Sequence, residues 1–108
     1  MAGGMGKLLK QAKKMQEDMQ RVQEELAERE VKASVGGGVV EVVATCDSRI
    51  KAITIKPEAL DPEDVEMLQD LVVAAVNQAL EEASIVSAAE MAKITGGLGG
   101  MMSGLGGL

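Results

Sequence analysis

The sequence predicts an α+β domain in which a long helix is followed by a three-stranded antiparallel sheet and a second helix. Three observations support this prediction: a heptad-like apolar spacing near the start, alternating and β-branched residues in the middle, and a capped apolar stripe after Pro57. The 108 residues are 46% hydrophobic and 26% charged, which suits one globular domain. We assign residues 1–95 to that domain and residues 96–108 to a flexible tail.

The first predicted helix extends from about residue 6 to residue 30. Its apolar residues recur at intervals of four and three, which is typical of a narrow coiled-coil seam. At ~1.5 Å per residue the helix is roughly 36 Å long, so it extends past any core that its own chain can build. The seam therefore requires a partner helix. It consists of Leu8, Ala12, Met15, Met19, Val22 and Leu26.

The middle of the chain predicts a meander of three strands, because its apolar segments are separated by turn-forming residues. The three glycines Gly36–Gly38 suit a connection that needs positive φ or close backbone approach, and residues 47–49 suggest the second turn. The strands carry, in order, Val31, Ala33 and Val35, then the β-branched run 39–45, then Ile53 and Ile55.

A capping signal introduces the second helix. Asp61 suits the N-cap, Pro62 suits the first helical position, and the acids that follow suit the positive end of the helix dipole. The stripe after them is broad and rich in alanine, which suits close packing on the sheet. Residues 96–108 are dense in glycine, which disfavours a helix, and this composition is the basis for the predicted flexible tail.

The missing residue types exclude several kinds of chemistry. The chain has no His and one Cys, Cys46, so it lacks the usual general base, the commonest zinc ligand and any internal disulfide. We therefore predict no enzymatic activity, no metal, no cofactor and no small-molecule substrate. Cys46 is expected to be a buried small hydrophobe, and the acids around Asp61 are better explained by helix capping than by a calcium loop.

Composition also bears on location and association. We expect neither a signal peptide nor a membrane-spanning segment, and therefore a reducing cytoplasm as the setting. The chain has no Phe, Tyr or Trp, so each core side chain buries less area than an aromatic would. Association with a second copy is an obvious way to bury more.

Charge is distributed unevenly along the chain, whose net charge is -6. Residues 1–32 hold 7 basic and 6 acidic side chains, whereas residues 57–108 hold 1 and 9. Since the Debye length is about 8 Å at physiological salt, a basic face farther than that from the acidic helix acts nearly on its own. An acidic total therefore does not exclude a polyanionic partner.

The basic side chains of the first helix share one outer face, away from the seam. On the heptad register, Lys7, Lys14 and Arg21 occupy c positions, with Lys10 at f and Lys13 at b. Such a strip suits phosphate contacts, which need charge and reach rather than base-edge geometry. The alternative is a solvated face with ion pairs at i,i+4, from Lys13 to Glu17 and from Lys14 to Asp18. A membrane-bound helix is disfavoured, because the seam is narrow and lacks an aromatic anchor.

Several segments together resemble the YbaB/EbfC family of bacterial nucleoid-associated DNA-binding proteins. They are "LLKQAKKMQEDMQRVQEEL" (8–26), the Gly-x-Gly-x-Val pattern at Gly36, Gly38 and Val40, "LVVAAVNQAL" (71–80) and "MAKITGG" (91–97). The resemblance implies an α-β-β-β-α protomer that forms a homodimer with projecting helical arms. It also implies binding of double-stranded DNA in the nucleoid, a change of DNA conformation, and a contribution to nucleoid organisation or gene regulation.

The resemblance favours phosphate binding over the solvated-face interpretation, and the missing aromatics favour duplex over single-stranded nucleic acid, whose binding depends on stacking. We expect the sheet to add charge to that of the first helix. The alternative function is a protein-interaction adaptor that docks through the heptad helix. The expected DNA-binding residues are Lys7, Lys10, Lys13, Lys14, Arg21, Arg49, Lys51 and Lys56.

Overall fold

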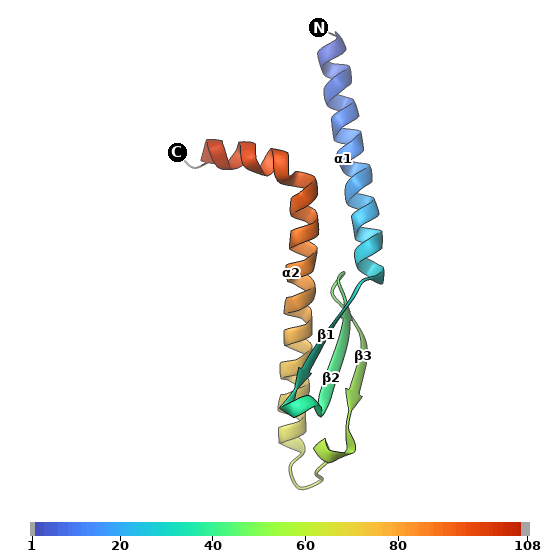
Figure 1. Ribbon diagram of the computed structural model, residues 1–108, viewed down its shortest axis with the longest axis vertical. Coiled ribbons are helices and arrows are strands. Elements are labelled where there is room, and N and C mark those ends of the chain that lie inside the picture. Colours follow the sequence, from blue (N-terminus) through green and yellow to red (C-terminus); the bar gives the residue numbers. More distant parts are fainter. Residues whose placement is uncertain (1, 107–108) are drawn as a thin grey trace.

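The chain folds into two long helices joined by a small sheet, giving an elongated molecule of 74 × 33 × 16 Å (Figure 1). A computed structural model describes the backbone of residues 2–106 and the side chains of residues 4–95. The element order is α-β-β-β-α, as predicted. The elements are α1 (Ala2–Glu28), β1 (Glu30–Val35), the 3-10 turn η1 (Gly36–Gly38), β2 (Val40–Thr45), β3 (Arg49–Ile55), the 3-10 turn η2 (Pro57–Ala59) and α2 (Val65–Gly106).

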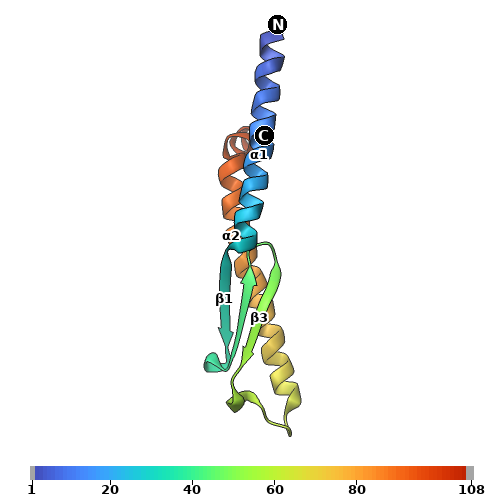
Figure 2. The same ribbon diagram turned by 90° about the vertical axis from the view of Figure 1, so that its right-hand side faces the viewer.

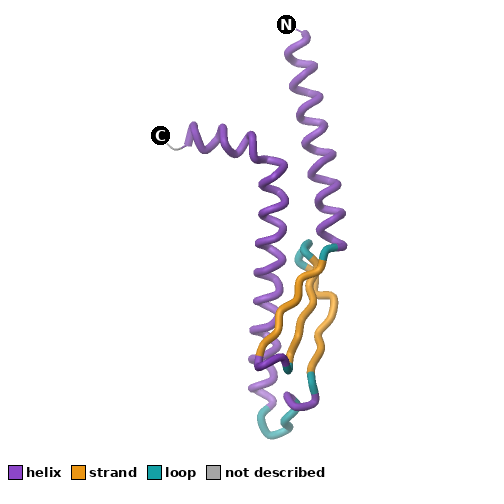
Figure 3. The backbone as a smooth tube through the Cα atoms, in the orientation of Figure 1, coloured by secondary structure: helices purple, strands orange, loops and turns teal. Residues whose placement is uncertain are grey.

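The sheet is an antiparallel meander with strand order β1-β2-β3, which confirms the predicted topology (Figure 3). Val40 pairs with Val35 on one side and with Ile55 on the other, and the register shifts once, between Val43 and Ala44. The central strand buries alternate residues, whereas every residue of β3 is exposed. β3 is therefore an open edge strand.

The connection between β1 and β2 confirms the expected role of the glycines. Gly36, Gly37 and Gly38 have φ of +63°, +72° and +95°, a region that other residues rarely adopt. A Cβ on Gly36 would also lie 2.9 Å from Val39 Cγ2 and 3.2 Å from Leu71 Cδ2. Gly36 thus lets the turn approach α2 closely.

The main core lies between α2 and one face of the sheet (Figure 2). Small side chains on α2 let the helix lie close to β1 and β2, the strands with which it makes most of its sheet contacts. The buried residues of this core are Ala33, Val40, Val42, Ala44, Ala75 and Ala79. The stripe predicted for the second helix is therefore the face that covers the sheet.

A second, smaller core joins the end of α1 to α2. Val22, Leu26 and Cys46 are buried there, against partly buried residues that include Val86 and Met91 of α2. The backbone N–H of Cys46 donates to the carbonyls of Leu26 at 3.0 Å and Arg29 at 2.9 Å, which ties β2 to the end of α1.

The start of α2 differs from the prediction. Asp64 caps the helix, since its Oδ1 accepts the N–H of Met67 at 3.2 Å, and α2 begins at Val65. Asp61 instead caps the preceding turn: its Oδ1 accepts the N–H of Glu63 at 2.9 Å, and its carbonyl accepts that of Asp64. The assignment of Asp61 as the helix cap is wrong by one turn, because both acids are good caps and sequence alone did not decide between them.

The far end of α2 changes direction (Figure 1) and extends to Gly106. This end includes most of the segment for which the sequence predicts a flexible tail. The side chains of residues 96–106 and the whole of residues 107–108 lie outside the described part, so the flexibility of residues 96–108 stays a prediction.

One described helix is long and apolar enough to cross a membrane by length and composition. It is the part of α2 from Val65 to Thr95, 31 residues long, which contains an 18-residue window with a mean hydropathy of 1.2. The sequence predicts no membrane-spanning segment, whereas this helix meets the criterion of length and composition. Of that window, 17% is buried in the fold, and Ala75 and Ala79 of the same helix pack against the sheet. A core helix of a soluble protein meets the same criterion.

Candidate nucleic-acid interface

Four lysines lie on the N-terminal half of α1, the part that projects beyond the sheet (Figure 1). All four are exposed, and none forms an ion pair with an acid among residues 4–95. In particular, the pairs from Lys13 to Glu17 and from Lys14 to Asp18, which the solvated-face interpretation expects, are not formed. The four residues, which we call the arm lysines, are Lys7, Lys10, Lys13 and Lys14.

The arm lysines cover about 10 Å of helix axis at ~1.5 Å per residue. Each lysine side chain is long and flexible and ends in a hydrated ammonium group. It can therefore reach a phosphate oxygen without requiring a fixed geometry. Nearby acids do not neutralise them, so their charge is available to a polyanion. This stretch of α1 therefore supplies the exposed, unpaired positive charge that phosphate binding requires.

Arg21 lies farther along α1 and differs from the arm lysines. Its guanidinium lies 3.2 Å from Asp18 Oδ1 and 3.9 Å from Glu25 Oε1, within the same helix. The side chain is 62% exposed, so it can still reach solvent. Any anion that binds Arg21 competes with two carboxylates already in place.

The basic residues of β3 are also paired with acids. Arg49 Nε lies 3.8 Å from Asp47 Oδ2, and Lys51 Nζ lies 2.5 Å from Glu30 Oε2. These residues line a hollow of about 560 Å³ together with Glu28, so acids outnumber bases there. Lys56 follows β3 and forms no ion pair within residues 4–95. The structure thus separates the predicted basic residues into an unpaired group on α1 and a mostly paired group on the sheet.

The predicted seam of α1 is covered over only half its length. Val22 and Leu26 are buried against the chain's own α2, and Met15 and Met19 are half-buried. Leu8 is 66% exposed, and Ala12 is exposed as well. The arm lysines and the uncovered part of the seam therefore occupy the same projecting segment.

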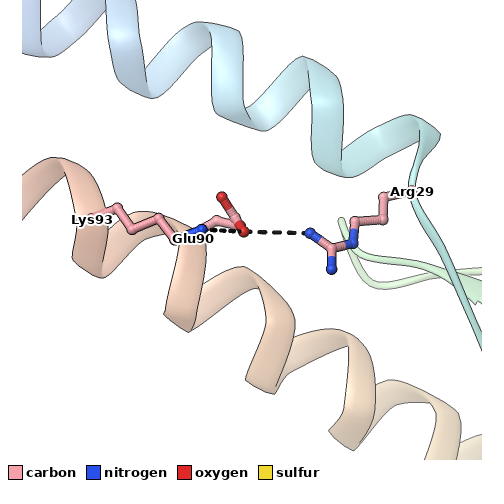
Figure 4. Close-up of polar contacts among 3 residues, drawn as sticks. All are labelled: Arg29, Glu90 and Lys93. Carbon is pink, nitrogen blue, oxygen red and sulfur yellow. Dashed lines mark hydrogen bonds and ion pairs between the residues drawn. The ribbon is translucent and has the colours of Figure 1, made fainter.

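A polar contact that sequence reasoning missed joins the two helices (Figure 4). Arg29 Nη1 lies 3.3 Å from Oε1 of Glu90, and the same oxygen accepts a hydrogen bond from Lys93 Nζ at 3.0 Å. The hydrogen bond from Lys93, followed by the charges of Lys93 and Arg29, lowers the pKa of Glu90 from its ordinary value. Arg29 and Glu90 are 61 positions apart, so no local pattern could have identified the pair.

Cys46 behaves as the sequence predicts for a small hydrophobe. It is a free, buried thiol at 1% exposure. Burial raises its pKa, against the opposing effect of the Arg29 charge. A thiol in this state is a poor nucleophile and a poor metal ligand.

Among the residues whose side chains are described, no group of three or more acidic or Cys side chains could hold a metal ion.

Comparison with known proteins places the chain among DNA-binding proteins. The YbaB/EbfC DNA-binding family matches residues 1–98. A nucleoid-associated protein of Acetivibrio thermocellus is 64% identical over 99 residues, covering 92% of this chain and 88% of that protein. Another, from Ruminiclostridium cellulolyticum, is 56% identical over 99 residues, covering 92% and 86%.

The fold has a counterpart among solved structures. An uncharacterized protein from Helicobacter pylori superposes with a TM-score of 0.62 over 73% of this chain and 80% of that one. Its sequence is 23% identical, so this likeness concerns the fold alone. The family match covers nearly the whole described chain, and the relatives agree with it. The chain therefore belongs to the YbaB/EbfC DNA-binding family.

Proposed function

We propose that this protein is a non-enzymatic, nucleoid-associated protein of the bacterial cytoplasm that binds double-stranded DNA through its phosphates. The observation that carries the proposal is the unpaired state of the arm lysines on an exposed helix end. The family and the names of the relatives support DNA as the polyanion. The chain has no aromatic residue, so stacking on single-stranded bases would have to rely on arginine.

The predicted DNA-binding residues should not contribute equally. A phosphate that contacts an arm lysine replaces only counterions and water, whereas one that contacts Arg21, Arg49 or Lys51 displaces a carboxylate. We therefore propose that the arm lysines provide most of the affinity and that Lys56 adds to it. Sequence preference would come from DNA shape and deformability, and bending of the duplex would change its conformation.

We further propose that the functional unit is a homodimer formed through the β3 side of the molecule. β3 is an open edge strand, and its Ile50, Ile53 and Ile55 are 36–44% exposed. An unpaired edge with isoleucines invites association with another chain. Replacing Ile53 by Lys should convert the dimer to a monomer in light scattering, whereas an unchanged mass would exclude this face.

A salt titration of duplex binding tests the DNA proposal. If a dimer presents the arm lysines twice, the slope of log K against log salt is expected to be about -7. Binding measured by fluorescence anisotropy should also be stronger for duplex than for single-stranded DNA. Equal affinity at low and physiological salt would contradict the mechanism.

A matched pair of charge reversals tests the site. Lys10→Glu on α1 is expected to weaken duplex binding by about tenfold or more, because it removes one phosphate contact and adds a repulsion. Lys32→Glu on β1 changes the net charge equally at another exposed lysine and should have little effect. Equal losses for the two variants would show that only net charge matters. Unchanged binding in a variant with Lys7, Lys10 and Lys14 all replaced by Glu would favour the adaptor function.

A further inference from the structure

The apolar seam of α1 is fully covered only where the two helices meet near the sheet. The cluster that joins them extends back along α1 to Val22 and forward along α2 to Ile94. Before Val22 the seam continues through Met19, Met15, Ala12 and Leu8. Leu8 is 66% exposed and Ala12 is exposed as well. A narrow apolar stripe of this kind is suited to packing against another helix.

The path of α2 leads toward the uncovered part of the seam. At the level of the cluster, α1 and α2 lie side by side and run in opposite directions (Figures 1 and 2). Each turn forward along α2 therefore lies beside a turn back along α1. The far end of α2 turns away from α1 (Figure 1). A continuation of α2 beyond Ile94 in its original direction would instead run along the seam toward Leu8.

The sequence after Ile94 has the spacing that such a continuation needs. Going back from Val22, the seam residues recur at intervals of three, four, three and four. Going forward from Ile94, apolar residues recur at intervals of four, three, four and three. They are Leu98, Met101, Leu105 and Leu108. Both series cover the same length, about 21 Å of helix at ~1.5 Å per residue, so each of these apolar residues has a seam residue at nearly the same level.

The glycines of this segment bear on both its direction and its packing. Gly96 and Gly97 directly follow Thr95, and glycine adopts many backbone conformations, so the chain can either turn or continue straight at this point. Glycines between the apolar residues add no side chain that would hold two helices apart. Because glycine has a low helix propensity, the arrangement of residues 96–108 depends strongly on the surface that they pack against.

We propose that residues 96–108 dock along the uncovered seam of α1 in the same chain. The helix pair then extends from the cluster at Val22 to the start of α1, with Met101 beside Met15 and Leu108 beside Leu8. The same chain is the favoured source, because the cluster already holds α2 against α1 and no further loop has to close. The docking continues an interface that the fold has already formed.

The docked segment leaves the basic face of α1 free. On the heptad register, Lys7, Lys10 and Lys14 lie on the outer face of the helix, away from the seam. Docking therefore orders the helix that carries these lysines without covering their charges. This contact of residues 96–108 goes beyond DNA binding and does not depend on it.

Hydrogen exchange of the full chain without DNA tests the docking. The amides of residues 8–19 should exchange about tenfold or more faster in a variant with Leu105→Ser and Leu108→Ser than in the wild type, because an uncovered helix opens more often. Equal exchange in the two proteins would overturn the proposal.

Val73→Ser is the matched control for the loss of an apolar side chain. Val73 is 58% exposed and lies on α2 well before Ile94. This substitution should leave the exchange of residues 8–19 unchanged. The same acceleration in Val73→Ser would assign the effect to a general loss of stability, which would also overturn the proposal.

Disulfide cross-linking shows where the segment docks and which chain supplies it. In a Cys46→Ala background, Met15→Cys combined with Met101→Cys should form a disulfide under mild oxidation, because the two positions lie at the same level. The control combines Glu17→Cys with Met101→Cys. Glu17 is exposed and occupies an f position on the outer face of α1, so this pair should stay reduced.

The mass of the cross-linked product on a denaturing gel distinguishes the outcomes. A disulfide within one chain, at the mass of the monomer, is the expected result. A covalent dimer would show that a second copy supplies the segment, and this would overturn docking within the same chain. Failure of the Met15→Cys pair to link, or equal linking of the Glu17→Cys pair, would also overturn the proposal. Circular dichroism shows separately that each variant folds.

Discussion

Arg29 Nη1 lies 3.3 Å from Oε1 of Glu90, so the first residue after α1 contacts the middle of α2. Lys93 donates to the same oxygen at 3.0 Å. Beneath this contact, Val22 and Leu26 pack on α2 together with Cys46. The pair thus lies where the projecting part of α1 joins the body of the molecule.

Replacing Glu90 by Gln should loosen this junction at neutral pH. The pKa of Glu90 is lowered below its ordinary value of 4.5, so the ionised form is favoured in the folded protein. The stabilisation is complete above the ordinary pKa and is lost as the pH falls through the lowered one. Wild type should therefore be more stable than Glu90→Gln at pH 7, and the gap should close in acid.

Urea unfolding across pH 3 to 7 checks this prediction. Glu24→Gln is the matched control, because Glu24 is exposed and forms no ion pair among residues 4–95. Hydrogen exchange in the last turns of α1 should be faster in Glu90→Gln than in the control. A stability gap that does not vary with pH would mean that packing, and not the charge of Glu90, is responsible.

Gly36→Ala should destabilise the protein by about 1–3 kcal/mol, because a left-handed backbone and a steric contact act together. Its φ is +63°, and the new Cβ would lie 2.9 Å from Val39 Cγ2. Gly37→Ala is the control: its φ is +72°, but its Cβ would meet no atom within 4 Å. Denaturant melts that show equal losses for both variants would assign the whole effect to φ.

Arg21→Gln should reduce DNA affinity less than Lys14→Gln. The two residues lie on the same face of the predicted heptad register, yet Arg21 is already paired with Asp18 and Glu25, whereas Lys14 is unpaired within the described side chains. Lys14→Gln removes one phosphate contact in each protomer. The slope of log K against log salt should therefore fall in magnitude by about 1 for each protomer. Anisotropy titrations that show equal changes for both would mean that DNA breaks the Arg21 ion pairs.

Cys46 should resist thiol reagents in the folded protein. The side chain is 1% exposed and burial raises its pKa, so both access and thiolate formation are disfavoured. Labelling with a chromogenic disulfide should follow the opening of the α1 junction and accelerate in Glu90→Gln. Rapid labelling of the native protein would contradict the buried state.

Cys46→Ser should lower the free energy of unfolding by about 1–3 kcal/mol, because it buries a hydroxyl. If that polar cost dominates, Cys46→Ser should be more destabilising than Cys46→Ala.

Several features follow from local chemistry and could be predicted from the sequence. Glycine adopts positive φ without the steric cost that other residues incur, and all three glycines of the β1–β2 connection have positive φ. Apolar periodicity similarly identified the meander and the face of α2 that covers the sheet. The helix start was assigned to the wrong acid, because Asp61 and Asp64 both suit an N-cap and the choice depends on how the chain leaves η2.

The order of elements and the grouping of basic residues at the start of the first helix could be predicted from the sequence, since both depend on neighbours within a turn or two. The extent to which α2 covers the seam, with Leu8 exposed and Leu26 buried, depends on the tertiary structure. The tertiary structure also decides which basic residues are paired, as Lys51 is with Glu30 and Arg29 with Glu90. These outcomes depend on contacts between residues far apart in the chain, whose distances no local pattern contains.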